Sequence, residues 1–226
     1  MVTVCWSVKG GTGLSVVAAA LALEVASLSH DHPTLLVDLA GDSGDVLGQP
    51  NSATPGAADW LDATGVPAAA LSGLVSAISP TLSLLPAGTV SDAAPGADRL
   101  TELAEWLQLW PGEVIVDAGR RASVRRPLLA RSDRSVLVLR RCYLAIAAAS
   151  GGDRPDHIVI VDEPGRSLTC ADVVAVLGAP VIARIPFDAS ISRAVDTGLL
   201  AARLPRLLSR ALRPMIDRPT LSRAVA

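Results

Sequence analysis

A glycine-rich segment between a predicted strand and a predicted helix constrains the fold of this chain more than any other feature. Residues 1–6 (MVTVCW) are apolar and β-branched and predict a buried strand, whereas residues 16–28 are rich in alanine and leucine and predict a helix. Residues 7–15 (SVKGGTGLS) join them. Glycines allow the backbone to turn several N–H groups toward one point, and the start of a helix adds partial positive charge. The sequence therefore predicts a phosphate-binding loop.

Lys9 lies inside this loop and is the only lysine of the chain. The sequence holds 20 lysine and arginine residues in total, so the other 19 are arginines. A lone lysine at this position indicates that the loop requires an ammonium group rather than a guanidinium group. The alternative is a chance placement, but four further residues fall in register with Lys9: Gly10, Gly11, Gly13 and Ser15.

The loop resembles the deviant Walker A motif of the MinD/ParA family, K-G-G-x-G-K-[ST]. By this resemblance Lys9 is the signature lysine and Ser15 is the magnesium-binding hydroxyl. Leu14 stands where the family has the lysine that grips the phosphates. The resemblance implies that ATP or ADP is bound together with Mg²⁺, and that the nucleotide-binding segment consists of Gly10, Gly11, Thr12, Gly13, Leu14 and Ser15.

The predicted strand over residues 33–39 ends near Asp38, which matches the first acid of the family's D-x-D motif. The resemblance makes Asp38 a catalytic and metal-binding candidate. Ala40 stands at the second acid, the one that positions the attacking water. Asp42 and Asp45 lie nearby, and either they substitute for it after a loop shift or they are solvated loop acids.

Residues 113–119 (EVIVDAG) predict a second strand that ends in an acidic residue. They resemble a Walker B strand followed by switch II. Asp117 is therefore the third catalytic candidate, beside Lys9 and Asp38. The resemblance implies that it supports a magnesium ion through water, so the metal candidates are Ser15, Asp38 and Asp117. The alternative is an ordinary parallel strand with an acid at its carboxyl end.

Two later segments resemble the part of the family fold that faces the nucleotide. The predicted strand over residues 158–162 ends in Asp162, where the family has an asparagine that reads adenine. A carboxylate accepts a hydrogen bond from an exocyclic amine but donates none. Residues 180–188 (PVIARIPFD) resemble the last strand and the loop after it, which places Pro186 at the nucleotide.

Residues 120–141 hold eight arginines: Arg120, Arg121, Arg125, Arg126, Arg131, Arg134, Arg140 and Arg141. They form either a solvated face or a surface for phosphate, acidic lipid, DNA or an acidic partner. The formal net charge of −2 argues against a globally basic nucleic-acid binder, and the scarcity of aromatic residues argues against stacking on single strands. Non-specific DNA contact remains an alternative, because family members that bind DNA use surface basic residues.

Residues 199–214 predict a basic amphipathic helix, and residues 215–226 predict a poorly ordered tail. The leucines of the helix either pack on the sheet or, as in several MinD-like proteins, make reversible membrane contact through residues 199–213. No secretory signal and no apolar run of membrane-spanning length is present. We therefore expect a cytoplasmic protein, either soluble or peripheral at the inner face of the membrane. The three cysteines show no metal-binding spacing.

Predicted strands alternate with predicted helices along the whole chain. Residues 41–55 predict a loop, residues 57–62 a short helix, residues 66–78 a looser helix and residues 81–88 a strand. This order predicts an α/β fold with a doubly wound, mostly parallel sheet and helices on both faces. It is the fold of a MinD/ARA-type P-loop NTPase, and the resemblance covers roughly residues 1–200 as one domain.

Three hypotheses about function follow from the altered loop. The first is a degenerate MinD/ParA-like scaffold for cell division, partitioning or pilus positioning, which resembles septum-site-determining or TadZ/CpaE-like members. It would form a homodimer, bind nucleotide weakly and hydrolyse little or no ATP. The second is an active ATPase in which an arginine from residues 120–141 replaces the loop lysine. The third is a basic adaptor that presents its fold to a membrane or a partner protein.

Overall fold

An eight-stranded sheet forms the centre of the part of the chain that the computed structural model describes, residues 1–29, 32–49, 55–91 and 94–216. The strand order is β3-β4-β2-β5-β1-β6-β7-β8. All neighbouring strands run parallel except β3 and β4, which are antiparallel. The strands are β1 (Val2–Trp6), β2 (Thr34–Asp38), β3 (Ser76–Ala77), β4 (Leu82–Leu85), β5 (Glu113–Asp117), β6 (Arg134–Arg140), β7 (His157–Asp162) and β8 (Val181–Pro186).

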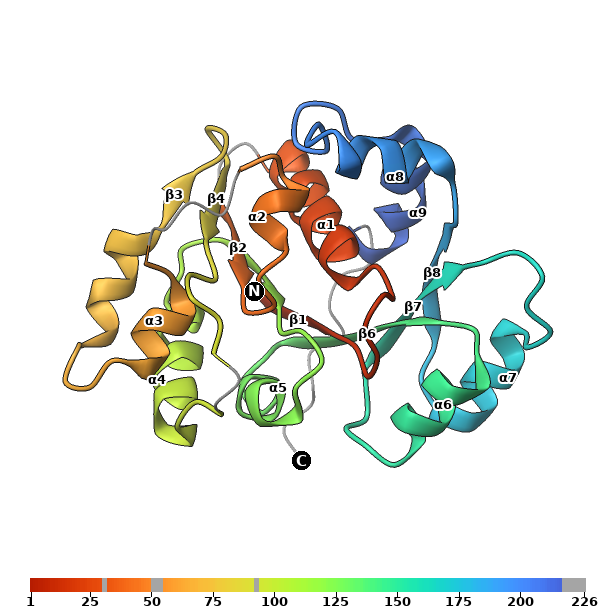
Figure 1. The fold of residues 1–226 in the computed structure, drawn as a ribbon, viewed down its shortest axis with the longest axis horizontal. Coiled ribbons are helices and arrows are strands. Elements are labelled where there is room, and N and C mark those ends of the chain that lie inside the picture. The colour runs from red at the N-terminus through yellow and green to blue at the C-terminus, as the bar shows by residue number, and fades with distance from the viewer. Residues whose placement is uncertain (30–31, 50–54, 92–93, 217–226) are drawn as a thin grey trace.

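Helices cover both faces of the sheet (Figure 1). One face carries α1 (Leu14–Leu28), α2 (Ser43–Val46), α8 (Ala189–Asp196) and α9 (Arg206–Ile216). The other face carries α3 (Ala57–Asp62), the 3-10 helix η1 (Ala68–Leu74), α4 (Ala97–Gln108), α5 (Ala122–Leu129), α6 (Tyr143–Ser150) and α7 (Cys170–Leu177). The predicted α/β fold with a mostly parallel, doubly wound sheet is therefore confirmed.

Side chains alternate between two apolar cores along the central strands. In β1, Val4 and Trp6 are buried on the face covered by α4 and α5, whereas Cys5 is buried on the face covered by α1. Successive residues of a strand point to opposite faces, so a strand that is apolar throughout serves both cores. This explains why β1 (VTVCW) is buried at every position and β5 (EVIVD) at every position after Glu113, rather than at alternate ones.

Two expectations about local structure were wrong between β2 and β4. Residues 66–78 form η1 and then β3, not one loose helix. The chain leaves the helical conformation after Leu74, where β-branched Val75 is extended and leads into the antiparallel pairing of β3 with β4. Within the predicted loop 41–55, residues Ser43–Val46 form the short helix α2; residues 50–54 lie outside the described part.

The C-terminal helix begins later and ends later than predicted. It spans Arg206–Ile216, because the carbonyl of Pro205 accepts the first helical hydrogen bonds, from Leu208 and Ser209. Pro214 lies inside the last turn and does not end the helix. The predicted tail therefore loses its first two residues to α9, and residues 217–226 lie outside the described range. Among the described helices none is long and apolar enough to cross a bilayer.

Two glycines join the loop after α2 to the end of α8. Gly48 has φ +73°, and a Cβ atom added there would lie 2.0 Å from the carbonyl oxygen of Gly198. Any side chain at position 48 would therefore be strained in its backbone and would also collide with the backbone of the facing segment.

We expect Gly48→Ala to lower the free energy of unfolding by about 2–4 kcal/mol, because left-handed strain and the collision with Gly198 add. Gly65→Ala is the matched control, since Gly65 has φ +74° and no atom within 4 Å of an added Cβ. It should lose only the strain, about 1–2 kcal/mol. Urea unfolding of both variants measures the difference. Equal losses would mean that the Gly48–Gly198 approach constrains nothing.

Candidate functional site

The loop between β1 and α1 has the backbone geometry of an anion-binding nest. Gly11 and Gly13 adopt left-handed conformations with φ +70° and +83°, and Gly13 forms the N-terminal boundary of α1. Ser7 braces the loop, because its hydroxyl donates to the carbonyl of Lys9 at 3.1 Å. Among the described residues no side chain caps the start of α1, so its first N–H groups are available to an anion.

The loop forms one wall of a cavity of about 490 Å³. Lys9 and every residue from Gly10 to Ser15 line it. That this segment binds a nucleotide remains a prediction. The opposite walls come from two loops that follow neighbouring strands. They contribute Leu39, Ala40, Asp42 and Val46 after β2, and Ala118, Gly119, Arg120 and Arg121 after β5.

Asp38 organises the loop that carries Ala40. Its Oδ1 accepts the N–H groups of Ala40 at 3.0 Å and Gly41 at 2.7 Å, and its Oδ2 accepts the N–H of Ser43 at 2.9 Å. Burial raises the pKa of Asp38, and these three N–H groups partly offset that rise. Both oxygens are committed to the backbone, so Asp38 positions the loop in this structure. Its predicted roles in catalysis and metal binding remain predictions.

Asp117 lies beside Asp38 at the carboxyl end of the neighbouring strand, in register with it. Its side chain is fully buried and accepts hydrogen bonds from the hydroxyl of Ser43 at 3.3 Å and from the N–H of Gly119 at 3.1 Å. Burial raises the pKa of Asp117 to about 6; a hydrogen bond from the Ser15 hydroxyl opposes the rise, and the charge of Asp38 adds to it. The structure thus brings Ser15, Asp38 and Asp117 together.

Ser15 and Asp117 suit the edge of a magnesium site. Mg²⁺ is commonly bound by one or two protein oxygens, with water and substrate phosphate completing its octahedron. A hydroxyl and a carboxylate in contact at the base of an anion nest match that requirement. No group of three acidic, histidine or cysteine side chains capable of holding a metal occurs among the described residues. An ion bound here would therefore take most of its ligands from phosphate and water.

Leu14 and Ala40 are apolar residues at two cavity positions where the family motif has a lysine and an acid. Leu14 is only 8% exposed and packs into the core beneath α1, so its position presents an alkyl chain where the motif has an ammonium group. Ala40 lines the cavity with a methyl group. Of the two nearby loop acids, Asp42 lines the cavity, whereas Asp45 lies on α2 and does not.

Most of the arginines in residues 120–141 serve the fold. Arg125 and Arg126 pair with Asp153 at 2.8 and 2.9 Å, and Arg125 also stacks on the Trp6 ring at 4.7 Å. Arg134 is buried and donates to the Thr3 hydroxyl. Further ion pairs join other arginines of this segment to acids of neighbouring elements: Arg131 with Glu105, Arg140 with Glu163, and Arg141 with Asp162.

Arg120 and Arg121 are the exceptions, because both line the nucleotide-sized cavity. The guanidinium group of Arg121 donates to the carbonyl of Ser91 at 2.7 Å on the cavity rim. The carbonyl of Arg120 accepts from Arg125, which fixes the backbone of this loop. The loop after β5 therefore brings two cations to the wall opposite the glycine nest.

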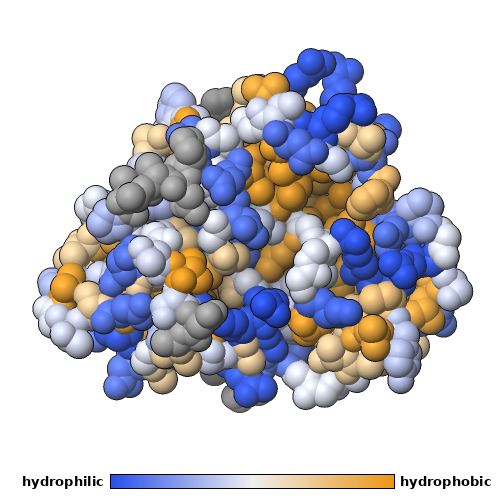
Figure 2. Space-filling view, in the orientation of Figure 1, coloured by the Kyte–Doolittle hydropathy of each residue, from blue (hydrophilic) through white to orange (hydrophobic). Residues whose placement is uncertain are grey.

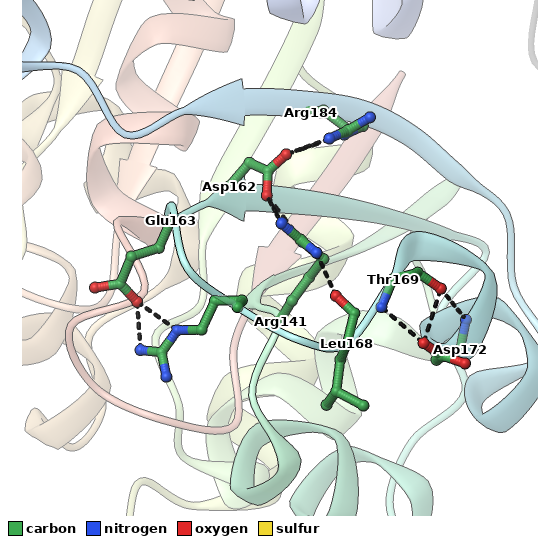
Figure 3. A network of polar contacts seen from close by, with 8 residues as sticks. Arg141, Asp162, Glu163, Leu168, Thr169, Asp172 and Arg184 are labelled. Carbon is green, nitrogen blue, oxygen red and sulfur yellow. Dashed lines mark hydrogen bonds and ion pairs between the residues drawn. The ribbon is translucent and has the colours of Figure 1, made fainter.

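Asp162 is not among the residues that line the cavity at the glycine loop. Its two oxygens accept hydrogen bonds from Arg141 and Arg184 (Figure 3), with Nε distances of 2.8 and 3.2 Å. Burial opposes ionisation, but Arg184 and Arg141 together lower the pKa of this carboxyl. Arg141 also donates to the carbonyl of Leu168. Both oxygens are thus occupied, and the predicted contact of Asp162 with a nucleotide base remains a prediction.

A second, apolar cavity of about 210 Å³ lies beside the glycine loop, between α1, the ends of β7 and β8, and α8. Figure 2 shows it as a hollowed apolar surface next to α1, toward α8. Gly13, Val161 and Pro186 line it, so Pro186 lies near the glycine loop, and its predicted contact with a nucleotide remains a prediction. Sequence reasoning missed Val161. The alternation of β7 was the available signal, since Val161 must face opposite to Asp162.

Comparison with known proteins finds neither a family model nor a curated protein that matches the chain. Solved structures do match. A ParA family ATPase from Chlorobium tepidum superposes with TM-score 0.76 at 23% identity, covering 93% of this chain and 95% of that one. The septum site-determining protein MinD of Pyrococcus horikoshii, complexed with Mg-ADP, has TM-score 0.75, 18% identity and 96% coverage of both chains. MinD in the MinC:MinD complex of Aquifex aeolicus has TM-score 0.73 and 21% identity, with 98% of both chains covered. The chain therefore has the MinD/ParA fold, as predicted.

The raised pKa of Asp117 predicts how stability depends on pH without metal or nucleotide. Between the ordinary value of 3.8 and about 6, the folded protein binds a proton that the unfolded chain has released. Stability should therefore fall as pH rises through this window, by about 3 kcal/mol for this group. Asp117→Asn should remove that part of the fall in urea unfolding at about pH 4 and about pH 7.

Asp62→Asn is the matched control, because it removes an exposed carboxylate at the end of α3. It should leave the pH dependence unchanged. If Asp117→Asn retains the whole difference between the two pH values, burial of Asp117 does not destabilise the folded state.

Proposed function

We propose that this protein is a nucleotide-binding spatial organiser of the MinD/ParA type, which works as a dimerising scaffold and hydrolyses ATP slowly or not at all. One observation carries the proposal: the anion nest is complete in its backbone, while Leu14 and Ala40 line the cavity where a cation and an acid are expected. Binding without hydrolysis is the chemistry that such a site supports best.

The chain's own groups have separate roles in this proposal. Backbone N–H groups of residues 10–15 hold the phosphates, and Ser15 and Asp117 hold the ion that neutralises phosphate charge. Lys9 reaches the phosphates bound by the partner subunit in the dimer. Loss of the charge-assisted contact at position 14 weakens binding by about 1.5–3 kcal/mol, or roughly ten- to hundred-fold. Ala40 orients no water, so the γ-phosphate is held but not attacked efficiently.

The matching solved structures support the nucleotide and partner parts of the proposal. One is a MinD complexed with Mg-ADP, and another is a MinD bound to MinC. By analogy, we infer that ATP or ADP with Mg²⁺ is the ligand, that the chain forms a homodimer, and that the dimer recruits a partner protein. Cell division, partitioning and pilus positioning are the processes in which such a scaffold would act.

An active ATPase is the second candidate, favoured by the place of Arg120 and Arg121. Both residues line the same cavity as Lys9, on the opposite wall. A guanidinium group from this wall would supply the charge that Leu14 lacks, and arginine binds phosphate in a bidentate manner. In this candidate the loop after β5 carries the cation, and hydrolysis is retained.

The domain organisation and the cellular location are part of the same proposal. Residues 1–200 form the nucleotide-binding unit, and α9 (Arg206–Ile216) is the basic C-terminal helix. The exposed arginines of α9 support contact with an anionic membrane surface, so a cytoplasmic protein that visits the inner membrane face is proposed. Non-specific DNA contact is the weaker proposal, because arginines of residues 125–141 are engaged in ion pairs within the fold.

Leu14→Lys tests whether the nest is intact. The added ammonium group should tighten binding of a non-hydrolysable Mg–ATP analogue about ten- to hundred-fold, measured by calorimetry. Leu14→Met is the matched control, because it keeps a flexible apolar chain and should change affinity less than about threefold. No gain in affinity for Leu14→Lys, with the fold retained, would reject nucleotide binding at this loop.

Phosphate release separates the two candidates. The scaffold proposal expects turnover at background for the wild type, with and without anionic liposomes or DNA, because position 40 carries no acid. The second candidate expects measurable turnover that Arg120→Ala or Arg121→Ala reduces at least about tenfold. Arg131→Ala, which removes only the exposed pair with Glu105, is the matched control. Turnover that survives both cavity variants would contradict both accounts.

A further inference from the structure

A groove of about 940 Å³ separates α8 from the start of α9. Three arginines and three leucines dominate its lining: Arg193, Arg203, Arg206, Leu199, Leu204 and Leu207. It shares no lining residue with the nucleotide cavity or with the apolar cavity beside the glycine loop. Its volume is at the upper end of the range of about 300–1,000 Å³ that is typical of binding pockets.

The arginines of this groove differ from those of residues 125–141 in how they are paired with acids. None of the three forms an ion pair within 4.0 Å with a described residue, whereas those of residues 125–141 are largely paired. Asp188 is the acid that Arg193 approaches, and its carboxylate is already hydrogen-bonded to the N–H of Ser190 at 2.7 Å. The groove therefore presents three arginines without an ion-pair partner among the described residues, on a chain whose formal net charge is −2.

The leucines of the groove are exposed for a structural reason. Leu200, Leu208 and Leu212 are fully buried against β8 and α1, so they already satisfy the core-facing side of this segment. Leu199 and Leu207 remain 52% and 46% exposed and lie along the groove. A bilayer is a broad surface that does not fill a concave site between two helices. A peptide segment does, which favours a protein ligand over lipid.

We propose that the groove between α8 and α9 binds an acidic, leucine-bearing segment of another protein. Glutamate or aspartate side chains of that segment would pair with Arg193, Arg203 and Arg206, and its leucines would cover Leu199 and Leu207. The chain's own residues 217–226 do not match this chemistry, because they contain one acid, Asp217, and two arginines. The proposal requires no nucleotide and does not depend on the function proposed above.

The probe is a fluorescein-labelled amphipathic helical peptide of glutamate and leucine, about 14 residues or four turns long, added to the full-length protein without nucleotide. Fluorescence anisotropy measures its Kd. Arg203→Glu with Arg206→Glu should weaken binding at least about tenfold. The matched control is Arg210→Glu with Arg213→Glu, which makes the same charge change on exposed positions of α9 outside the groove. It should change the Kd less than about threefold.

Two further arms test the apolar contribution and the lipid alternative. Polyglutamate of equal length should bind at least about tenfold more weakly than the leucine-bearing peptide, and Leu207→Ser should weaken only the latter. Equal losses in both double variants, or equal binding of polyglutamate, would overturn the proposal. So would flotation with phosphatidylglycerol vesicles that requires Arg203 and Arg206 while the peptide fails to bind. All variants alter exposed side chains, and an unchanged urea midpoint verifies that they fold.

Discussion

Two carboxylates buried side by side, Asp38 and Asp117, are the constraint on which the site depends. Parallel pairing of β2 and β5 puts them in register at the carboxyl edge of the sheet. Neither can be solvated, so each is held by donors from the loops that follow, and those loops acquire their shape from it. Ser43 connects the two carboxylates, since its N–H donates to Asp38 and its hydroxyl donates to Asp117. The cavity walls are therefore set by electrostatics as much as by packing.

The sequence predicted the central strands and the glycine loop because continuous apolar runs and glycine spacing are local signals. The proximity of Asp38, Asp117 and Ser15 could be predicted from the sequence, because the carboxyl ends of parallel strands lie at the same edge of the sheet. The orientation of Asp162 was not foreseen. It depends on two arginines from other segments, Arg141 just after β6 and Arg184 in β8, and no local pattern records such a partnership. The short helix α2 was not predicted because a helix of this length has no periodic signal of its own, and α9 was predicted to begin too early because its first hydrogen bonds are accepted by Pro205.

The glycine loop adopts the backbone of an anion nest with leucine at position 14. The left-handed glycines and the start of α1 need no lysine, because leucine is a good helix former and packs into the core beneath α1. The side chain of Leu14 thus contributes to the core at the start of α1. Such a loop retains the directional N–H donors that recognise an anion. In the function proposed above, the leucine leaves recognition of an anion to these N–H donors alone.

The arginines of the described residues fall into two groups, those with a partner inside the fold and those along the groove. Where a guanidinium group lies against a strand or helix of the core, an acid or a carbonyl accompanies it, as Asp153 does for Arg125 and the Met215 carbonyl for Arg134. Along the groove of α8 and α9 no such partner has been placed among the described residues. The Gly48–Gly198 contact ties the end of α8 to the loop after α2, whose Val46 lines the nucleotide cavity. Gly198 lies between Thr197 and Leu199, two residues that line the groove, so this backbone contact lies between the groove and the cavity beside the glycine loop.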